Sequence, residues 1–154
     1  MDPSLHEISV QVVAARPTAV IARRTTWAEF PRLWRPLLDE VYAVLARPGA
    51  PSPGCNVMLY RDDVPHVEVG VEVPAPFATA GPVISSALPG GTVAVTVHRG
   101  PYDQLDAAHR AVRAWCAAHG HELAGPRWEV YGDWREDPAD LETTVSYLIR
   151  PDGA

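Results

Sequence analysis

Lysine is absent from this sequence, and no stretch of it is strongly basic. All 13 basic residues among its 154 residues are arginine, and the formal net charge is −6 at pH 7. Because a protein that neutralises phosphates needs clustered basic side chains, we expect no direct binding of nucleic acid. No apolar run approaches the ~20 residues of a membrane span. The first ten residues also lack the charged and apolar regions of a signal peptide, so we expect neither membrane insertion nor secretion.

Cysteine is scarce as well, since the chain has only Cys55 and Cys116. They form no CxxC pair and cannot build a disulfide framework, which indicates reduced thiols in a cytoplasmic protein. His119 and His121 do not have the spacing of a zinc motif. The sequence also contains no nucleophile elbow and no phosphate-binding glycine loop. We therefore expect neither a metal nor another cofactor.

Hydrophobic residues make up 47% and charged residues 21% of the sequence, which predicts one compact domain over residues 1–154. Alternating and helical patterns indicate an α+β protein. Helices are predicted over residues 30–45 and 100–120, and strands over residues 5–14, 18–24, 55–62, 66–74, 82–88, 92–99, 125–134 and 141–151. Thr26 and Glu29 form a capping box for the first helix, which Pro36 should kink or delay. The "PGG" at 89–91 predicts a hairpin turn between its flanking strands.

The two halves of the chain follow the same order of a strand, a helix and two strands. The segment "ARRTTW" can be laid over "VHRGPY", and "GCNVMLYRD" over "GPRWEVYGD". This weak internal repeat, approximately residues 5–76 and 77–151, indicates two β-α-β-β modules related by a pseudo-twofold axis within one domain.

Three segments carry a specific resemblance to a known family. They read "LPGGTVAVTVHRGPYDQLDAAHRAVRAWCAAHG" at 88–120, "GPRWEVYGD" at 125–133 and "ETTVSYLIRP" at 142–151. Together they resemble the GyrI-like family of small-molecule-binding domains, which also forms the effector-binding half of BmrR-type multidrug regulators. The strongest marks are Gly-Pro-Tyr at 100–102 and Trp-Glu-Val-Tyr at 128–131. The resemblance covers essentially the whole chain, which would be a stand-alone form of the domain.

This resemblance implies two modules that share a curved antiparallel sheet, with both helices on one face and a ligand cleft on the other. Strand alternation then assigns side chains to faces. The set expected to pack under the helices comprises Val67, Val69, Val71, Val73, Thr143, Val145, Tyr147 and Ile149, with Val57, Leu59, Trp128 and Val130. The set expected to line the cleft on the opposite face is Met58, Tyr60, Glu129 and Tyr131.

Glu129 is the central acid of this predicted cleft. Because burying an unpaired carboxylate is costly, an acid among aromatic rings suits a pocket that receives a cation. Met58 supplies an adaptable wall, and the resemblance places the family's cation-sensing acid at Glu129. Trp27 and Tyr102 either edge the cleft or staple the core, and Glu68 is either a second cleft acid or an exposed strand carboxylate. The alternative interpretation is that Glu129 itself is a solvated edge residue.

Two functions of different classes fit these residues. The first is a stand-alone protein that binds planar hydrophobic, often cationic, aromatic compounds, drugs among them, without catalysis. The second, implied by the resemblance, is a hydrolase that opens the cyclopropane ring of DNA-alkylating antibiotics. There Glu129 would act as base and Tyr131 or Tyr60 as donor to the oxyanion. The resemblance also admits a separate regulatory protein or gyrase as a partner.

Overall fold

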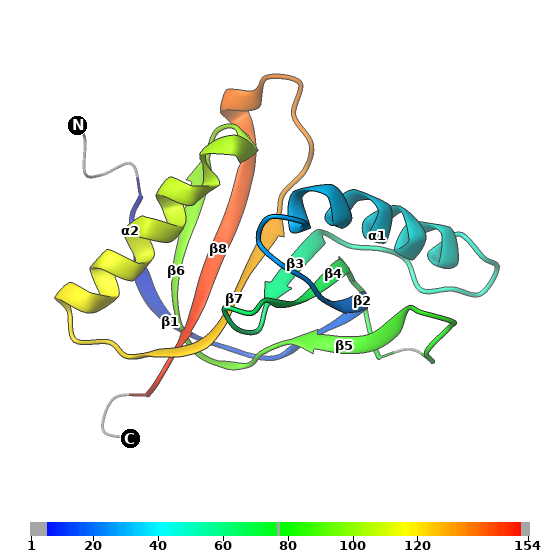
Figure 1. Cartoon of the computed structure of the whole chain (residues 1–154), viewed down its shortest axis with the longest axis horizontal. Coiled ribbons are helices and arrows are strands. Elements are labelled where there is room, and N and C mark those ends of the chain that lie inside the picture. The colour runs from blue at the N-terminus through cyan, green and yellow to red at the C-terminus, as the bar shows by residue number, and fades with distance from the viewer. Residues whose placement is uncertain (1–5, 77, 152–154) are drawn as a thin grey trace.

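The computed structural model describes residues 6–76 and 78–151 as one eight-stranded antiparallel sheet with two α-helices (Figure 1). The predicted α+β class is confirmed. The elements are β1 (Ser9–Val13), β2 (Arg16–Arg24), α1 (Phe30–Leu45), β3 (Asn56–Tyr60), β4 (His66–Glu72), β5 (Ile84–Leu88), β6 (Gly91–Arg99), η2 (Tyr102–Gln104), α2 (Leu105–Ala118), β7 (Leu123–Tyr131), η3 (Pro138–Asp140) and β8 (Glu142–Ile149). The expected repeat boundaries at residues 5 and 77 lie outside the described residues, and the repeat itself stays a prediction.

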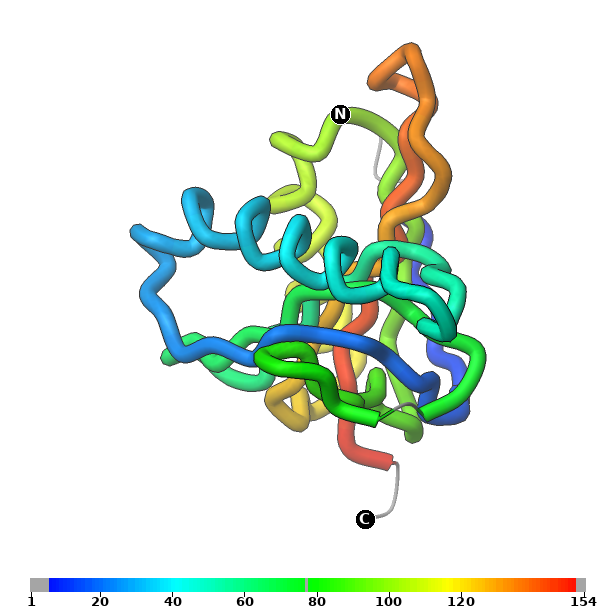
Figure 2. The backbone as a smooth tube through the Cα atoms, turned by 90° about the vertical axis from the view of Figure 1, so that its right-hand side faces the viewer, coloured from blue at the N-terminus to red at the C-terminus, as the bar shows by residue number. Residues whose placement is uncertain are grey.

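A long two-stranded ribbon links the two ends of the sheet, whose strand order is β1-β6-β8-β7-β3-β4-β2-β5. β1 and β2 follow each other along one strand of the ribbon, and β5 and β6 along the other. The pairing passes from Val13↔Gly91 to Arg16↔Leu88 without a register change. Figures 1 and 2 show β2 and β5 side by side at one end of this ribbon.

The ribbon corrects the predicted hairpin at residues 89–91. β5 pairs with β2, whereas β6 pairs with β1 and β8, so the two strands flanking "PGG" do not pair with each other. The glycines instead allow a close crossing of backbones, because a Cβ on Gly90 would lie 2.7 Å from the Ala15 nitrogen. A turn signal thus marks the place where the chain passes from one half of the sheet to the other.

The first helix forms where its apolar spacing predicts it. Its buried stripe of Leu37, Leu38, Val41, Val44 and Leu45 packs against the valines of β4. The Thr26 hydroxyl accepts a hydrogen bond from the Glu29 amide at 3.1 Å, as one half of the predicted capping box. Pro36 does not delay the helix, which begins at Phe30 and continues through the proline.

The second helix covers the other half of the same sheet face. Leu105, Ala108, Val112 and Cys116 are buried against residues of β6 and β8, among them Val145. One row of directly paired residues crosses the sheet beneath both helices, and its members are Thr96, Val145, Glu129, Met58, Val69 and Ile21. None of the helices in the described part of the chain is long and apolar enough to cross a membrane.

The far face of the sheet has its own apolar core beneath the ribbon. Its members are Val20, Val57, Leu59, Leu88, Val93, Val95 and Trp128. This corrects the expected placement of Val57, Leu59, Trp128 and Val130 under the helices. The register pairs Met58 with Val69 and Leu59 with Glu68, and directly paired residues share a face. The side chains of Met58, Tyr60, Glu129 and Tyr131 therefore lie on the helix face, and not on the opposite one.

Candidate functional site

Glu129 lies in the middle of the sheet, on the helix face, and only 5% of it is exposed. One carboxylate oxygen, Oε1, accepts hydrogen bonds from the hydroxyls of Tyr60 at 3.0 Å and Tyr131 at 2.5 Å. The other, Oε2, lies 2.6 Å from Nε2 of His109. The carboxylate is therefore buried but well satisfied, which is the condition under which a protein tolerates such a group.

A chain of polar contacts continues from Glu129 through the second helix. Nδ1 of His109 lies 2.7 Å from the Tyr147 hydroxyl, and Arg113 donates to the same hydroxyl oxygen at 2.9 Å. Because Arg113 occupies the oxygen as a donor, the Tyr147 proton is free to point at Nδ1. A neutral imidazole then carries its proton on Nε2 and donates it to Glu129. In this series from Arg113 through Tyr147 and His109, each group donates its hydrogen bond in the direction of the Glu129 carboxylate.

Aromatic rings extend from this acid to the surface on both sides. Trp27 lies 5.6 Å from the Tyr60 ring and Tyr102 lies 5.4 Å from the Tyr131 ring, measured between centroids. Trp27 is 46% and Tyr102 40% exposed, whereas Tyr60 is buried. Trp27 precedes α1 and Tyr102 opens the turn before α2. The two exposed rings are thus the outer members of an aromatic cluster whose inner tyrosines bond to Glu129.

Sulfur and guanidinium groups complete the walls of this cluster. The Met58 sulfur lies 3.4 Å from the Tyr131 hydroxyl and 3.7 Å from that of Tyr60. On the Trp27 side, the Arg127 guanidinium carbon lies 5.6 Å from the indole centroid, and its Nη2 pairs with Asp63 at 2.8 Å. We call the group formed by Trp27, Tyr60, Tyr102, Glu129 and Tyr131 the interhelical cleft, after the ligand cleft that the family resemblance implies.

The tyrosines of the interhelical cleft are held in their neutral form. Burial, and next to it the negative charge of Glu129, raises the pKa of Tyr60 and of Tyr131 well above 10. Burial also raises the pKa of Tyr147, although Arg113 acts in the opposite direction. These hydroxyls therefore remain proton donors across the physiological pH range.

The raised tyrosine pKa values predict instability in alkali. The folded protein keeps Tyr60 and Tyr131 protonated where the unfolded chain releases these protons, so the free energy of unfolding should fall above about pH 10. Each group contributes a slope of about 1.4 kcal/mol per pH unit in that range, and none at lower pH. Tyr131→Phe removes one group, so its urea midpoint should fall less steeply than that of the wild type as the pH rises from about 10. Parallel declines in the two proteins would show that Tyr131 is not protected.

The structure brings six of the seven predicted site residues together. Met58, Tyr60, Glu129 and Tyr131 share direct contacts, and Trp27 and Tyr102 join them through ring contacts.

Glu68 is the predicted site residue that lies elsewhere. It is buried on the far face, where Oε2 accepts from Nε of Arg61 at 2.5 Å and Oε1 accepts from the Ser86 hydroxyl at 2.6 Å. Its strand parity is opposite to that of the cleft residues, because Glu68 is paired with Leu59. Glu68 is therefore neither a cleft acid nor an exposed strand carboxylate.

The sequence interpretation missed three members of the hydrogen-bond network around Glu129, namely His109, Arg113 and Tyr147. His109 falls four residues after Leu105, on the buried stripe of α2, and Arg113 follows one turn later. A titratable residue on the apolar stripe of a helix was the signal that could have found His109, whereas Arg113 is exposed and Tyr147 lies on a strand. Tyr147 was assigned to the correct face but only as a core residue.

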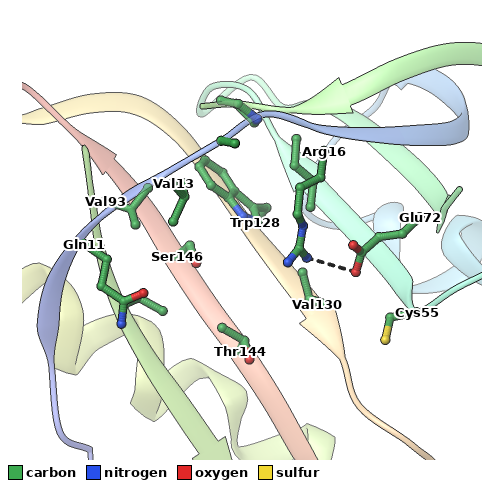
Figure 3. A pocket seen from close by; sticks show the side chains of 14 residues that line it. Gln11, Val13, Arg16, Cys55, Glu72, Val93, Trp128, Val130, Thr144 and Ser146 are labelled. Atoms are coloured by element: carbon green, nitrogen blue, oxygen red, sulfur yellow. Dashed lines mark ion pairs between the residues drawn. The ribbon is translucent and has the colours of Figure 1, made fainter. Parts of the chain in front are cut away.

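Two cavities lie away from Glu129. One of about 280 Å³ lies under the ribbon on the far face, beside Trp128 and the Arg16–Glu72 ion pair of 2.9 Å (Figure 3). The second, of about 390 Å³, lies between Arg23, Arg61 and Glu68. Neither is lined by Glu129 or by the groups bonded to it. We place the candidate site in the interhelical cleft, because a buried acid, phenol donors and exposed rings converge there.

Within 6–76 and 78–151, no group of three or more His, Cys, Asp or Glu side chains could hold a metal ion. In the cleft, His109 and Glu129 are fully engaged with each other and with tyrosine hydroxyls.

The chain belongs to the GyrI-like family of small molecule binding domains, whose model matches residues 6–150. The predicted family membership is thereby confirmed. Among curated proteins, none matches the chain significantly.

Several solved structures share this fold. The C-terminal domain of EcmrR superposes with a TM-score of 0.78 at 20% identity, over 95% of this chain and 98% of that domain. SAV2435, solved bound to tetraphenylphosphonium, gives a TM-score of 0.70 at 14% identity, over 94% of each chain. A hydrolase from Listeria innocua gives 0.60 at 11% identity, over 94% of this chain and 92% of that one. At these identities the likeness establishes the fold.

Proposed function

We propose that this protein binds planar hydrophobic, often cationic, aromatic compounds in the interhelical cleft. The observation that carries the proposal is Glu129, a buried carboxylate surrounded by the rings of Tyr60 and Tyr131 and reached from the exposed rings of Trp27 and Tyr102. A buried acid among rings has little value for stability alone, because an apolar residue would fill the same space at lower cost. Its placement suits recognition.

The chemistry of the cleft matches an aromatic cation. Each ring face attracts a cation by ~0.5 to 2 kcal/mol through its quadrupole. The carboxylate adds an attraction that does not require hydrogen-bond geometry, so ligands without N–H groups are accepted. Met58 provides a polarizable wall that adapts to different shapes. The tetraphenylphosphonium bound by SAV2435 is an aromatic cation without N–H groups, although tetrahedral and not planar, and it supports cation binding by analogy of fold.

Titration of a rhodamine dye with a permanent positive charge tests the proposal. We expect saturable fluorescence anisotropy with a Kd on the order of 1 to 10 μM, because the cleft has rings and one acid but few fixed polar contacts. Tetraphenylphosphonium should displace the dye. Glu68→Gln is the matched control, since it also removes a buried strand carboxylate but on the far face, and it should leave the Kd unchanged. The absence of saturable binding by several unrelated cationic dyes would reject this function.

Hydrolysis is the second candidate function. It is favoured by one observation, the contact of 2.6 Å between Glu129 and His109, which gives the carboxylate a proton-transfer partner beside two phenol donors. A carboxylate so placed could activate water against a strained ring, and a tyrosine hydroxyl could donate to the developing oxyanion. Mass spectrometry of a cyclopropane-containing alkylating antibiotic after incubation separates the candidates, because hydrolysis adds one water to the compound and binding alone leaves it unchanged.

A further inference from the structure

We infer that His109 is an internal counter-ion of Glu129 and determines which ligands the interhelical cleft accepts. While its imidazole is neutral, the cleft takes permanent aromatic cations; once it is protonated, the cleft takes neutral aromatic compounds instead. This inference rests on the proposed function and assigns to it a residue that selects ligands by charge.

The geometry places His109 where a cationic ligand needs the charge of Glu129. Its Nε2 lies 2.6 Å from Oε2, and the imidazole side chain is only 13% exposed. The two tyrosine hydroxyls occupy Oε1, so Oε2 is the oxygen whose environment changes with the state of the histidine. His109 comes from α2, whereas Glu129 comes from β7, and the pair therefore bridges a helix and the sheet at the base of the cleft.

Both protonation states fit the same contacts. A neutral imidazole accepts from Tyr147 and donates to Glu129, which leaves the carboxylate charge available to a ligand. A protonated imidazole donates to Glu129 from Nε2 and to the Tyr147 oxygen from Nδ1, so the Tyr147 bond reverses its direction, and it carries a full positive charge against the carboxylate. In that state the pair is neutral overall, and a cation entering the cleft meets no net attraction from it.

The neighbouring charged groups do not act as counter-ions of Glu129 in place of His109. Arg113 on α2 reaches only the far side of the Tyr147 hydroxyl, at 2.9 Å. Arg127 on β7 pairs with Asp63 beside Trp27. The phenols of Tyr60 and Tyr131 stay neutral, because their pKa values are raised by burial and by Glu129. The charge at the base of the cleft therefore changes with His109 and Glu129 alone among these contacts.

Thermodynamic linkage turns the geometry into two measurable effects. A charged imidazole places a like charge several ångströms from a bound cation, which weakens binding by about tenfold or more. By reciprocity, a cation that binds the neutral form more tightly displaces the proton from those molecules in which His109 carries one. A neutral aromatic ligand has no such coupling.

Affinity as a function of pH is the first test. Rhodamine 6G should bind the wild type about tenfold more weakly at about pH 5.5 than at about pH 8, whereas the neutral dye Nile red should bind equally well or better at the lower pH. His109→Gln keeps a donor for Glu129 but cannot acquire a charge, so the affinity ratio between the two pH values should shrink. His119→Gln, at the far end of the same helix, should keep the full ratio.

Calorimetry of the wild type is the second test, and it does not depend on a variant that folds. Tetraphenylphosphonium titrated in buffers of different ionisation enthalpy, at several pH values from about 5 to 8, should release protons at one or more of them, up to about one per ligand. Identical pH profiles of wild type and His109→Gln, with no proton release, would overturn the inference while leaving cation binding intact. Absence of cation binding at every pH would overturn this inference together with the proposed function.

Discussion

Gly70→Ala should destabilise the protein by about 3 kcal/mol or more, because the added methyl group has no space. A Cβ on Gly70 would lie 1.9 Å from the carbonyl oxygen of Ala19 and 2.8 Å from Cα of Val20. Both are backbone atoms of β2, which pairs with β4 at this point. The collision is therefore with the backbone and cannot be relieved by rotating a side chain. The strands would have to separate where the ribbon joins the sheet. Urea unfolding followed by tryptophan fluorescence measures the loss.

Gly120→Ala is the control for this prediction. Gly120 has a left-handed φ of 74° but nothing within 4 Å of its Cβ position, so alanine there incurs backbone strain without a collision. The expected loss is about 1 to 2 kcal/mol. If Gly70→Ala were no less stable than Gly120→Ala, β2 could not approach β4 as closely as the structure shows. That result would contradict the path of the β2 backbone beside Gly70.

The alternation of Met58 with Tyr60, and of Glu129 with Tyr131, was sufficient to predict that these four side chains share one face. Alternation is a property of each strand by itself, and a local pattern records it directly. Which side chains of two neighbouring strands lie on the same face is a different matter, because it depends on which residues of the two strands pair. Val57 and Leu59 were placed under the helices since they are apolar, but the pairing of Met58 with Val69 puts them on the far face.

The far-face core explains why the face of Val57 and Leu59 could not be predicted from the local sequence pattern. Trp128 and Leu59 are buried there because the ribbon of β1–β2 and β5–β6 covers them. That ribbon joins residues far apart in sequence, and the "PGG" at its bend has the same composition as a hairpin turn. The sequence therefore predicted which elements form, whereas their long-range pairing, and with it the face of the cleft, required the structure.

Glu129→Gln should weaken the binding of cationic aromatic dyes by ~1 to 3 kcal/mol, the value of a charge interaction away from water. The amide is nearly isosteric, its oxygen can accept from Tyr60 and Tyr131, and its nitrogen can donate to Nε2 of His109 when the imidazole takes the Nδ1–H tautomer and donates to the Tyr147 oxygen instead. The network can therefore be rebuilt, and we expect the variant to fold with thermal stability unchanged or slightly raised, because an amide is easier to bury than a carboxylate. A neutral dye should lose much less affinity, which separates the charge effect from general damage to the cleft.

The central claim is that Glu129, between the two helices, is the acid that attracts cationic ligands, and one comparison tests it most directly. Rhodamine 6G is titrated against wild type, Glu129→Gln and Glu68→Gln, with Nile red as the neutral probe. We expect Glu129→Gln to raise the rhodamine Kd by about 5- to 150-fold and to change the Nile red Kd little, while Glu68→Gln behaves like the wild type. Equal rhodamine affinities in wild type and Glu129→Gln would contradict the claim and remove Glu129 from ligand recognition.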